Sequence, residues 1–241
     1  MKINYEKLHE LSFLNRENLY KEKENINFNY FSKRLGEIEN DPFIGFVGSK
    51  YAEVKVRVLF LGKSNAASAP KDQNKDIQIN QYLRNFRDSS ENLENRYRDY
   101  AKQYSDKSSG AFRAWKINLY SVYFRGTLGL DIEETAYANI VPFRYEDAPE
   151  NRSVYEGRKI YEIAFNNFTN KLISIIKPHL IIPLGANLKK YSIDRFINSR
   201  ESEIKVSDGI SRTRGDLRIS ELGKETLNNA IEDYEALFAG N

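Results

Sequence analysis

The sequence contains no cysteine and only two histidines, and both shortages narrow the chemistry that it can support. Without cysteine there is no disulfide, no thiolate-bound zinc, no cysteine-held iron–sulfur cluster and no thiol nucleophile. The two histidines, His9 and His179, lie far apart along the chain, so neither a histidine-ligated metal site nor a Ser-His-Asp triad is expected. The sequence therefore predicts a protein that works without a metal and without a cofactor.

Long apolar runs and a strong charge of one sign are missing as well. No segment reaches the length of a membrane span, and the first residues, MKINYEKLHE, have no signal-peptide core. We therefore expect a cytoplasmic protein with no membrane partner, and we expect it to be a monomer. The formal net charge of +3 is too small to predict nucleic-acid binding by itself. The 16 tyrosines and 14 phenylalanines, by contrast, are numerous, and they suit either a core or the stacking of bases.

Three apolar runs predict buried strands at residues 56–61, 137–143 and 180–184. The first and the third lack polar alternation, which is typical of parallel strands covered on both faces. Apolar residues at three- and four-residue spacing predict helices within residues 112–123, 160–176 and 227–238. Strands that alternate with helices indicate an α/β domain with a parallel sheet and right-handed crossovers.

The chain reads as one domain over residues 1–241, with two less regular parts. Residues 1–50 form a charged, mostly helical N-terminal extension. The stretch 66–110 is polar and long for a crossover, so it is interpreted as an insertion. It is either a simple solvated insertion or a lid or flap over a binding site.

Small or polar residues follow each predicted strand, at the edge of a parallel sheet where ligands bind. The first strand leads into Gly62 and the residues KSNAAS, the second carries Asn139, and the third ends at Gly185. Each glycine has a simpler interpretation as a turn residue. The triplet at Gly62 is not a phosphate-binding loop, because Arg57 stands where that motif requires its first glycine.

Taken in order, these segments resemble the uracil-DNA glycosylase superfamily. Its first motif is a strand ending in glycine, followed within three residues by the acid or amide that handles the attacking water. Here the sequence LFLGKSN places Ser64 two positions and Asn65 three positions after Gly62.

The second and third parts of the resemblance point to the cluster-containing bacterial and archaeal branch of that superfamily. A stretch of that branch reads roughly Asn-Val-Val-Lys-Cys-Arg and then Asn-Arg; this chain has NIVPFR at 139–144 and then Asn151 and Arg152. A later strand of the Lys-Pro-x-x-Ile-x-x-Leu-Gly-Ala type corresponds to KPHLIIPLGA at 177–186. The resemblance covers about residues 54–192 and implies a three-layer αβα fold around a central, mostly parallel four-stranded sheet.

Three departures from the family are equally informative. No histidine follows His179, where the family supplies one on a second catalytic loop, and the cysteines that would hold a cluster are absent. The usual acid of the first motif is also missing. The expected substrate is therefore a modified pyrimidine rather than plain uracil.

The resemblance implies a catalytic role for Asn65, assisted by Ser64, and a base-binding role for Asn139. An asparagine amide does not titrate, so Asn65 would hold the attacking water rather than deprotonate it. Its alternative role is to cap a following helix, for which asparagine is well suited. The alternative for Asn139 is a buried structural amide that bonds a neighbouring loop, since a polar group inside an apolar strand needs a partner.

Other predicted contacts involve aromatic and basic side chains. Phe143 and Tyr82 are base-stacking candidates, together with Phe86. Predicted DNA contacts are Lys63, Arg144, Asn151, Arg152, Arg212 and Arg214, of which Arg152 and the last two also suit a plain surface role. His179 is expected to be structural, at the end of the sheet opposite the site.

Three functions remain open at this point. The first is a hydrolase that excises a damaged or modified base from DNA, in repair or antiviral defence. The second is a catalytically silent module on the same fold that binds nucleic acid or a nucleotide. The third, a flavodoxin-like enzyme for small ligands, is weakened by the absence of a phosphate-binding glycine cluster.

Overall fold

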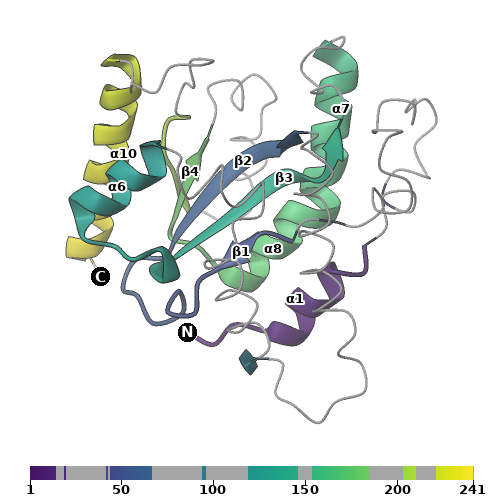
Figure 1. Ribbon diagram of the computed structural model, residues 1–241, viewed down its shortest axis with the longest axis horizontal. Coiled ribbons are helices and arrows are strands. Elements are labelled where there is room, and N and C mark those ends of the chain that lie inside the picture. The colour runs from purple at the N-terminus through teal and green to yellow at the C-terminus, as the bar shows by residue number, and fades with distance from the viewer. Residues whose placement is uncertain are drawn as a thin grey trace.

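A mixed five-stranded β-sheet lies at the centre of the protein, with its strands in the order β1-β3-β2-β4-β5 (Figure 1). The computed structural model describes residues 1–14, 19, 42, 44–66, 94–95, 119–145, 154–184, 203–209 and 221–240. The strands are β1 (Phe46–Val47), β2 (Val58–Ala66), β3 (Thr135–Tyr145), β4 (Leu180–Pro183) and β5 (Lys205–Val206). Strand β1 runs antiparallel to β3, and the other three strand pairs are parallel.

The α/β class predicted from the sequence is confirmed, but the described sheet has five strands where four were expected. Strands β1 and β5 are two residues long, which is too short for a periodic pattern to reveal them. The three predicted strands correspond to β2, β3 and β4. The first of them is longer than predicted, because β2 continues through Gly62 to Ala66.

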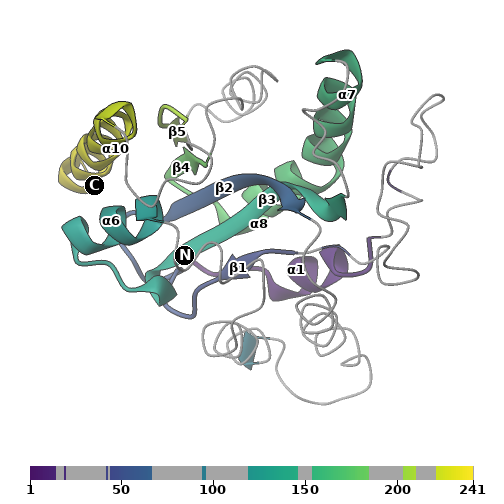
Figure 2. The ribbon, with the colours of Figure 1, turned by 45° about the horizontal axis from the view of Figure 1, so that its top comes forward.

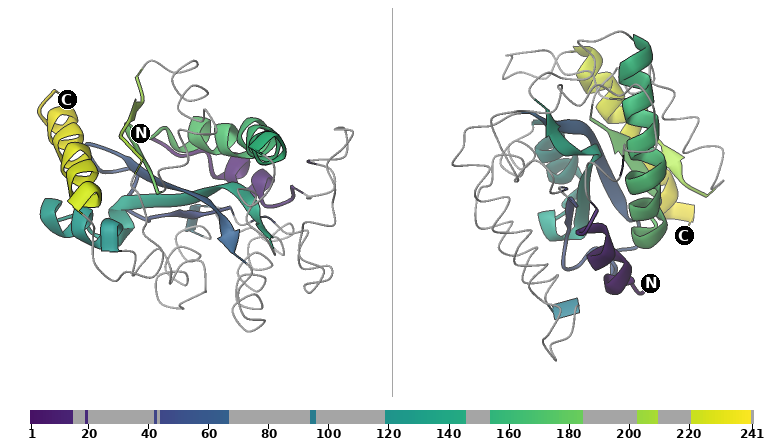
Figure 3. Two further views of the ribbon diagram at one scale, coloured as in Figure 1. Left: turned by 90° about the horizontal axis from the view of Figure 1, so that it is seen from above. Right: turned by 90° about the vertical axis from the view of Figure 1, so that its right-hand side faces the viewer.

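Helices cover both faces of the sheet (Figures 2 and 3). Their bounds are α1 (Tyr5–Leu11), α6 (Leu119–Leu128), α7 (Val154–Ala164), α8 (Asn170–Ile176) and α10 (Glu221–Gly240), with a 3-10 turn η3 (Ile132–Glu134) and a π-helical turn η5 (Phe165–Thr169). Helix α7, η5 and α8 follow one another without a break. Of these, α7 and η5 pack against β3, and α8 packs against α1. Helices α6 and α10 pack against each other on the opposite side.

The core explains the apolar runs in the first part of β2 and along β4. Residues 58–61 of β2 and 180–182 of β4 are fully buried. Phe60 meets Phe124 of α6 edge-on, with ring centroids 5.6 Å apart, and Phe124 meets Tyr234 of α10 in the same way at 5.9 Å. Strands covered on both faces read as continuous apolar runs, which is the pattern found in the sequence.

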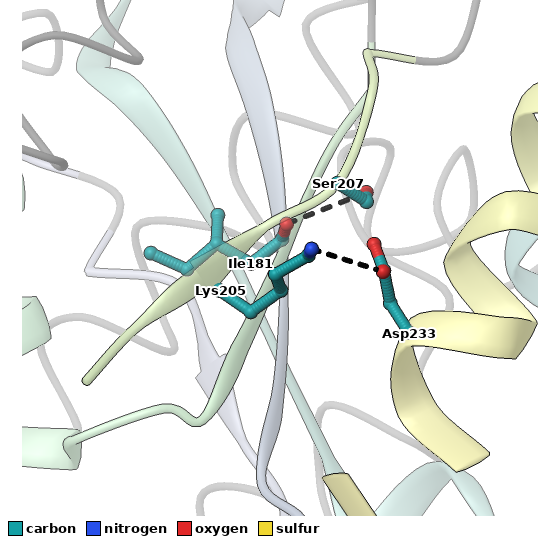
Figure 4. A network of polar contacts seen from close by, with 4 residues as sticks. All are labelled: Ile181, Lys205, Ser207 and Asp233. Atoms are coloured by element: carbon teal, nitrogen blue, oxygen red, sulfur yellow. Dashed lines mark hydrogen bonds and ion pairs between the residues drawn. The ribbon is translucent and has the colours of Figure 1, made fainter. Parts of the chain in front are cut away.

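Polar contacts attach the C-terminal helix to the edge of the sheet (Figure 4). Lys205 of β5 forms an ion pair with Asp233 of α10, with Nζ and Oδ1 3.3 Å apart. Lys55, just before β2, lies over the ring of Phe238 of α10, with Nζ 4.4 Å from the ring centroid. The hydroxyl of Ser207 donates to the carbonyl oxygen of Ile181 and joins the segment after β5 to β4. No helix in the described part of the chain combines the length and the apolar character needed to cross a membrane.

The order of the parallel strands places a candidate site at their carboxyl ends. The chain passes from β2 to β3 on one side, then crosses back to β4 on the other side of β2. In doubly wound sheets, ligands bind outside the carboxyl ends of the strands where the order reverses in this way. That position lies at the end of β2, beyond Leu61, the last residue of β2 that pairs with β4.

Candidate functional site

Strands β2 and β3 bring several predicted site residues into register at their carboxyl halves. Gly62 lies beside Asn139, Ser64 beside Val141, and Asn65 beside Arg144. Gly62 and Asn65 are three residues apart, or about 10 Å along an extended strand. The main chain therefore gathers the predicted catalytic pair and the predicted base-binding amide at one end of the sheet.

A bulge interrupts the pairing at this point. The register shifts between Ser64 and Asn65, so that Pro142 and Phe143 of β3 are additional residues between the partners Val141 and Arg144. Proline has no N–H to donate to a sheet ladder and is found in strands mainly at edges and bulges. Pro142 thus explains in sequence terms why β3 departs from regular pairing next to Asn65.

Asn139 is buried in the sheet, and its side chain is hydrogen-bonded. Its exposed fraction is 1%, and its Oδ1 accepts a hydrogen bond of 3.0 Å from the hydroxyl of Tyr137, which is 8% exposed. The two residues are two positions apart on β3, so they share one face of the sheet. One partner of the amide is therefore a residue of the same strand.

Gly62 is the third member of this arrangement. A Cβ atom at Gly62 would lie in overlap with Asn139 Oδ1 and 3.2 Å from the hydroxyl oxygen of Tyr137. Only glycine therefore leaves room for the amide over β2. The cluster of Gly62, Tyr137 and Asn139, called here the amide cluster, combines a donor and an acceptor inside an otherwise apolar layer.

The strand assignment corrects two interpretations drawn from the sequence. Gly62 was given an alternative role as a turn residue, but it lies inside β2 and pairs with Asn139. Asn65 was given an alternative role as a helix cap, but Asn65 and Ala66 both belong to β2, so no helix begins directly after Asn65. An N-cap residue must directly precede the first helical residue, which excludes this alternative.

Other predicted residues are placed only in part. The backbones of Lys63, Phe143 and Arg144 lie in β2 and β3 near the bulge. Six predicted residues lie outside the described part of the chain: Tyr82, Phe86, Asn151, Arg152, Arg212 and Arg214. The insertion 66–110 and the extension 1–50 also fall mostly outside it. Their predicted contacts with DNA or with a base stay predictions.

His179 lies at the opposite end of the sheet, as expected, immediately before β4. Nη2 of Arg57 lies 2.7 Å from Nε2 of His179, and the backbone N of Arg57 lies 3.2 Å from Nδ1. Burial and the Arg57 guanidinium lower the pKa of His179, and Glu203 opposes them. Both of these Arg57 groups only donate, whereas a neutral imidazole has a single acceptor nitrogen, so the ring accepts from one of them at a time. An imidazolium could accept from neither, so the imidazole is neutral in this contact.

Sequence reasoning missed Tyr137. Its ring was counted as part of an apolar strand, although its position two residues before Asn139 was a usable signal.

Among the described residues, no group of three or more histidine or acidic side chains is placed to hold a metal ion. No family model matches the chain, and no curated protein matches it.

Proposed function

We propose that the chain is a DNA N-glycosylase-like hydrolase with a uracil-DNA glycosylase-like fold. It flips a modified pyrimidine out of DNA and cleaves the bond between the base and its sugar. The observation that carries the proposal is the amide of Asn139, 1% exposed, beside Gly62 and at the same sheet edge as Ser64 and Asn65. A polar side chain held in a buried central strand next to a ligand-binding edge suits recognition of a base.

The proposed reaction needs little covalent chemistry from the protein. Water bonds to the sugar carbon as the bond to the base nitrogen breaks, and the electron pair of that bond leaves with the base. The proton that the water gives up ends on the departing base. The products are a free base and an abasic sugar. The protein must extrude the nucleotide, hold the base, place the water and stabilise the departing charge.

Two asparagines divide these tasks in the proposal. Asn139 pairs with the edge of the base, since an amide offers both a donor and an acceptor. Asn65, three residues beyond Gly62 on β2, holds the water below the sugar. Ser64 assists Asn65, and basic residues of both strand ends, including Lys63 and Arg144, contact phosphate.

Base release from defined oligonucleotides tests this proposal. Duplexes and single strands carrying uracil, mismatched thymine or a hypermodified cytosine are incubated with the protein, and abasic sites are scored by alkali cleavage. Release of at least one base is expected. Asn65→Ala should lower the rate more than tenfold, which corresponds to about 1.4 kcal/mol of barrier. Asn167→Ala, an asparagine of η5 whose Nδ2 bonds only along its own helix in the described contacts, is the matched control and should retain the rate.

A second candidate is a binding module on the same fold. It is favoured by one observation, that Oδ1 of Asn139 already accepts a bond from Tyr137, as a purely structural amide would. DNA binding without release of any base would overturn the hydrolase and leave this module. Neither binding nor release would overturn both.

A further inference from the structure

We propose that Tyr137 is a positioning residue, whose hydroxyl holds the amide of Asn139 over Gly62 so that this amide discriminates between bases. The role in discrimination rests on the proposed function. The held amide itself rests on the geometry of the amide cluster alone. Tyr137 is not proposed to touch the base.

The Tyr137 hydroxyl lies beside the Asn139 amide. Tyr137 and Asn139 lie on the same face of β3 and pair with Phe60 and Gly62 of β2, respectively. The tyrosine ring therefore lies along the strand toward the amide, and its hydroxyl reaches Oδ1 at 3.0 Å. Both side chains are buried, so water does not readily replace this bond.

The absence of a side chain at Gly62 leaves the space that the Asn139 amide occupies. The amide oxygen occupies the volume where a side chain at position 62 would begin, and the Tyr137 hydroxyl borders the same volume. An asparagine side chain has only two rotatable bonds. A hydrogen bond on one side and a closely approaching main chain on the other leave the amide plane little freedom to rotate.

An amide held in one orientation favours recognition of one base. A reader group whose rotamer is already set loses less conformational freedom on binding, and it rejects bases whose donor and acceptor pattern does not match. A freely rotating amide satisfies more than one pattern. Loss of the Tyr137 hydroxyl should therefore reduce discrimination between bases, while the protein still folds.

The variant that isolates this effect is Tyr137→Phe, which removes only the hydroxyl oxygen. Tyr161→Phe is the matched control, because Tyr161 is a fully buried tyrosine on α7. For each protein, the release rates of the best and second-best bases in the oligonucleotide series are measured, and their ratio is compared. We expect the ratio to fall about tenfold in Tyr137→Phe and to be unchanged in Tyr161→Phe.

A spectroscopic readout tests the held amide without any ligand. The side-chain amide pair of Asn139 is assigned in a ¹⁵N–¹H spectrum as the pair that Asn139→Ala lacks. Its signals should move in Tyr137→Phe and stay in place in Tyr161→Phe. Gly62→Ala should move them too, and its effect on the base ratio should not add to that of Tyr137→Phe, because both act through one amide.

The outcomes separate the two proposals. An Asn139 amide pair that is unchanged in Tyr137→Phe overturns the inference, whatever the protein does to DNA. A pair that moves while the base ratio stays constant overturns the role in discrimination. A wild-type protein that neither binds nor cleaves any of the oligonucleotides overturns the proposed function, and the spectrum still decides whether Tyr137 holds the amide.

Discussion

Gly62 and Asn139 restrict each other at the residue scale. Asn139 is a polar residue in a buried strand, so its amide must find partners within the protein. The Tyr137 hydroxyl supplies one of them, and the missing side chain of Gly62 supplies the space. Neither position tolerates change without disturbing the other.

Gly62→Ala is therefore expected to destabilise the protein. The added methyl group overlaps Asn139 Oδ1, and overpacking of this kind costs about 1–3 kcal/mol of unfolding free energy. Denaturant unfolding measures the change. Gly126→Ala is the control: Gly126 lies inside α6, and a Cβ there meets nothing within 4 Å.

The control should shift stability in the opposite direction. Alanine is favoured over glycine in a helix by roughly 0.5–1 kcal/mol. Equal stability of Gly62→Ala and the wild type would mean that the amide moves freely, which contradicts the geometry of the amide cluster.

Two of the three members of this cluster, Gly62 and Asn139, were singled out from the sequence. Asn139 was identified because a polar residue inside an apolar run must be satisfied or functional. Tyr137 was missed because an aromatic ring in a strand is ordinarily core. Which polar atom its hydroxyl meets depends on side-chain direction, which a single sequence does not specify.

At the scale of elements, the irregularities of β3 and its covering helix coincide. β3 bulges at Pro142 and Phe143, and the helix that packs on it widens to a π-helical turn at η5. The hydroxyl of Thr169, the last residue of η5, donates to the carbonyl oxygen of Ile140 at 2.9 Å, next to Asn139. The helix thus supports β3 just before its bulge.

Thr169→Val should reveal this support. Valine keeps the shape of the side chain but leaves the Ile140 carbonyl without this buried donor, which costs about 1–3 kcal/mol of unfolding free energy. Thermal or urea unfolding measures the loss. Ser174→Ala is the control. The Ser174 hydroxyl is exposed, and in the described contacts it bonds only to the carbonyl oxygen of Asn170 in the preceding turn of α8. Its loss should change the free energy of unfolding by less than about 0.5 kcal/mol. An equal effect of the two substitutions would show that Thr169 does not support β3.

The elements themselves were largely predictable, with instructive exceptions. The three apolar runs became β2, β3 and β4, and the pattern at 160–176 became a helix that extends from α7 to α8. The first strand was predicted to end at residue 61, before Gly62, but β2 continues to Ala66. Gly62 lies inside the strand because the Asn139 amide occupies the space where a side chain would begin. Whether η5 is α- or π-helical depends on packing against β3, and helical periodicity does not distinguish the two.

At the scale of the whole molecule, the two ends of the sheet differ in kind. The carboxyl ends of β2 and β3 carry the amide cluster and the bulge. At the amino ends of β2 and β4, by contrast, hydrogen bonds connect the two strands to each other and to the end of α8. Arg57, just before β2, donates from Nε to the carbonyl oxygen of Lys177 at 2.7 Å and contacts the ring of His179. The main chain of Arg57 also accepts from the N–H groups of His179 and Leu180. This end links β2 and β4 to the end of α8.

This link makes the stability of the whole fold depend on pH. An imidazolium has no acceptor for the Arg57 guanidinium and would place a second positive charge beside it. Burial and Arg57 accordingly lower the pKa of His179, while Glu203 and a hydrogen bond to the main chain of Lys55 oppose the shift. Since the folded protein binds this proton less readily than the unfolded chain, the stabilisation is fully present above the ordinary histidine pKa of about 6.5. It is lost as the pH falls from there toward the lowered pKa.

The expected result is a lower free energy of unfolding at pH 5.5 than at pH 7.5, measured by urea denaturation at constant ionic strength. His179→Gln should remove most of this difference, because glutamine offers an acceptor to Arg57 and does not titrate. His9→Gln, which changes the other histidine of the sequence, should keep the difference. A wild-type protein of equal stability at both pH values would show that Arg57 and His179 do not interact as described. A difference that persists in both His179→Gln and His9→Gln would assign it to carboxyl groups, because the sequence contains no other histidine.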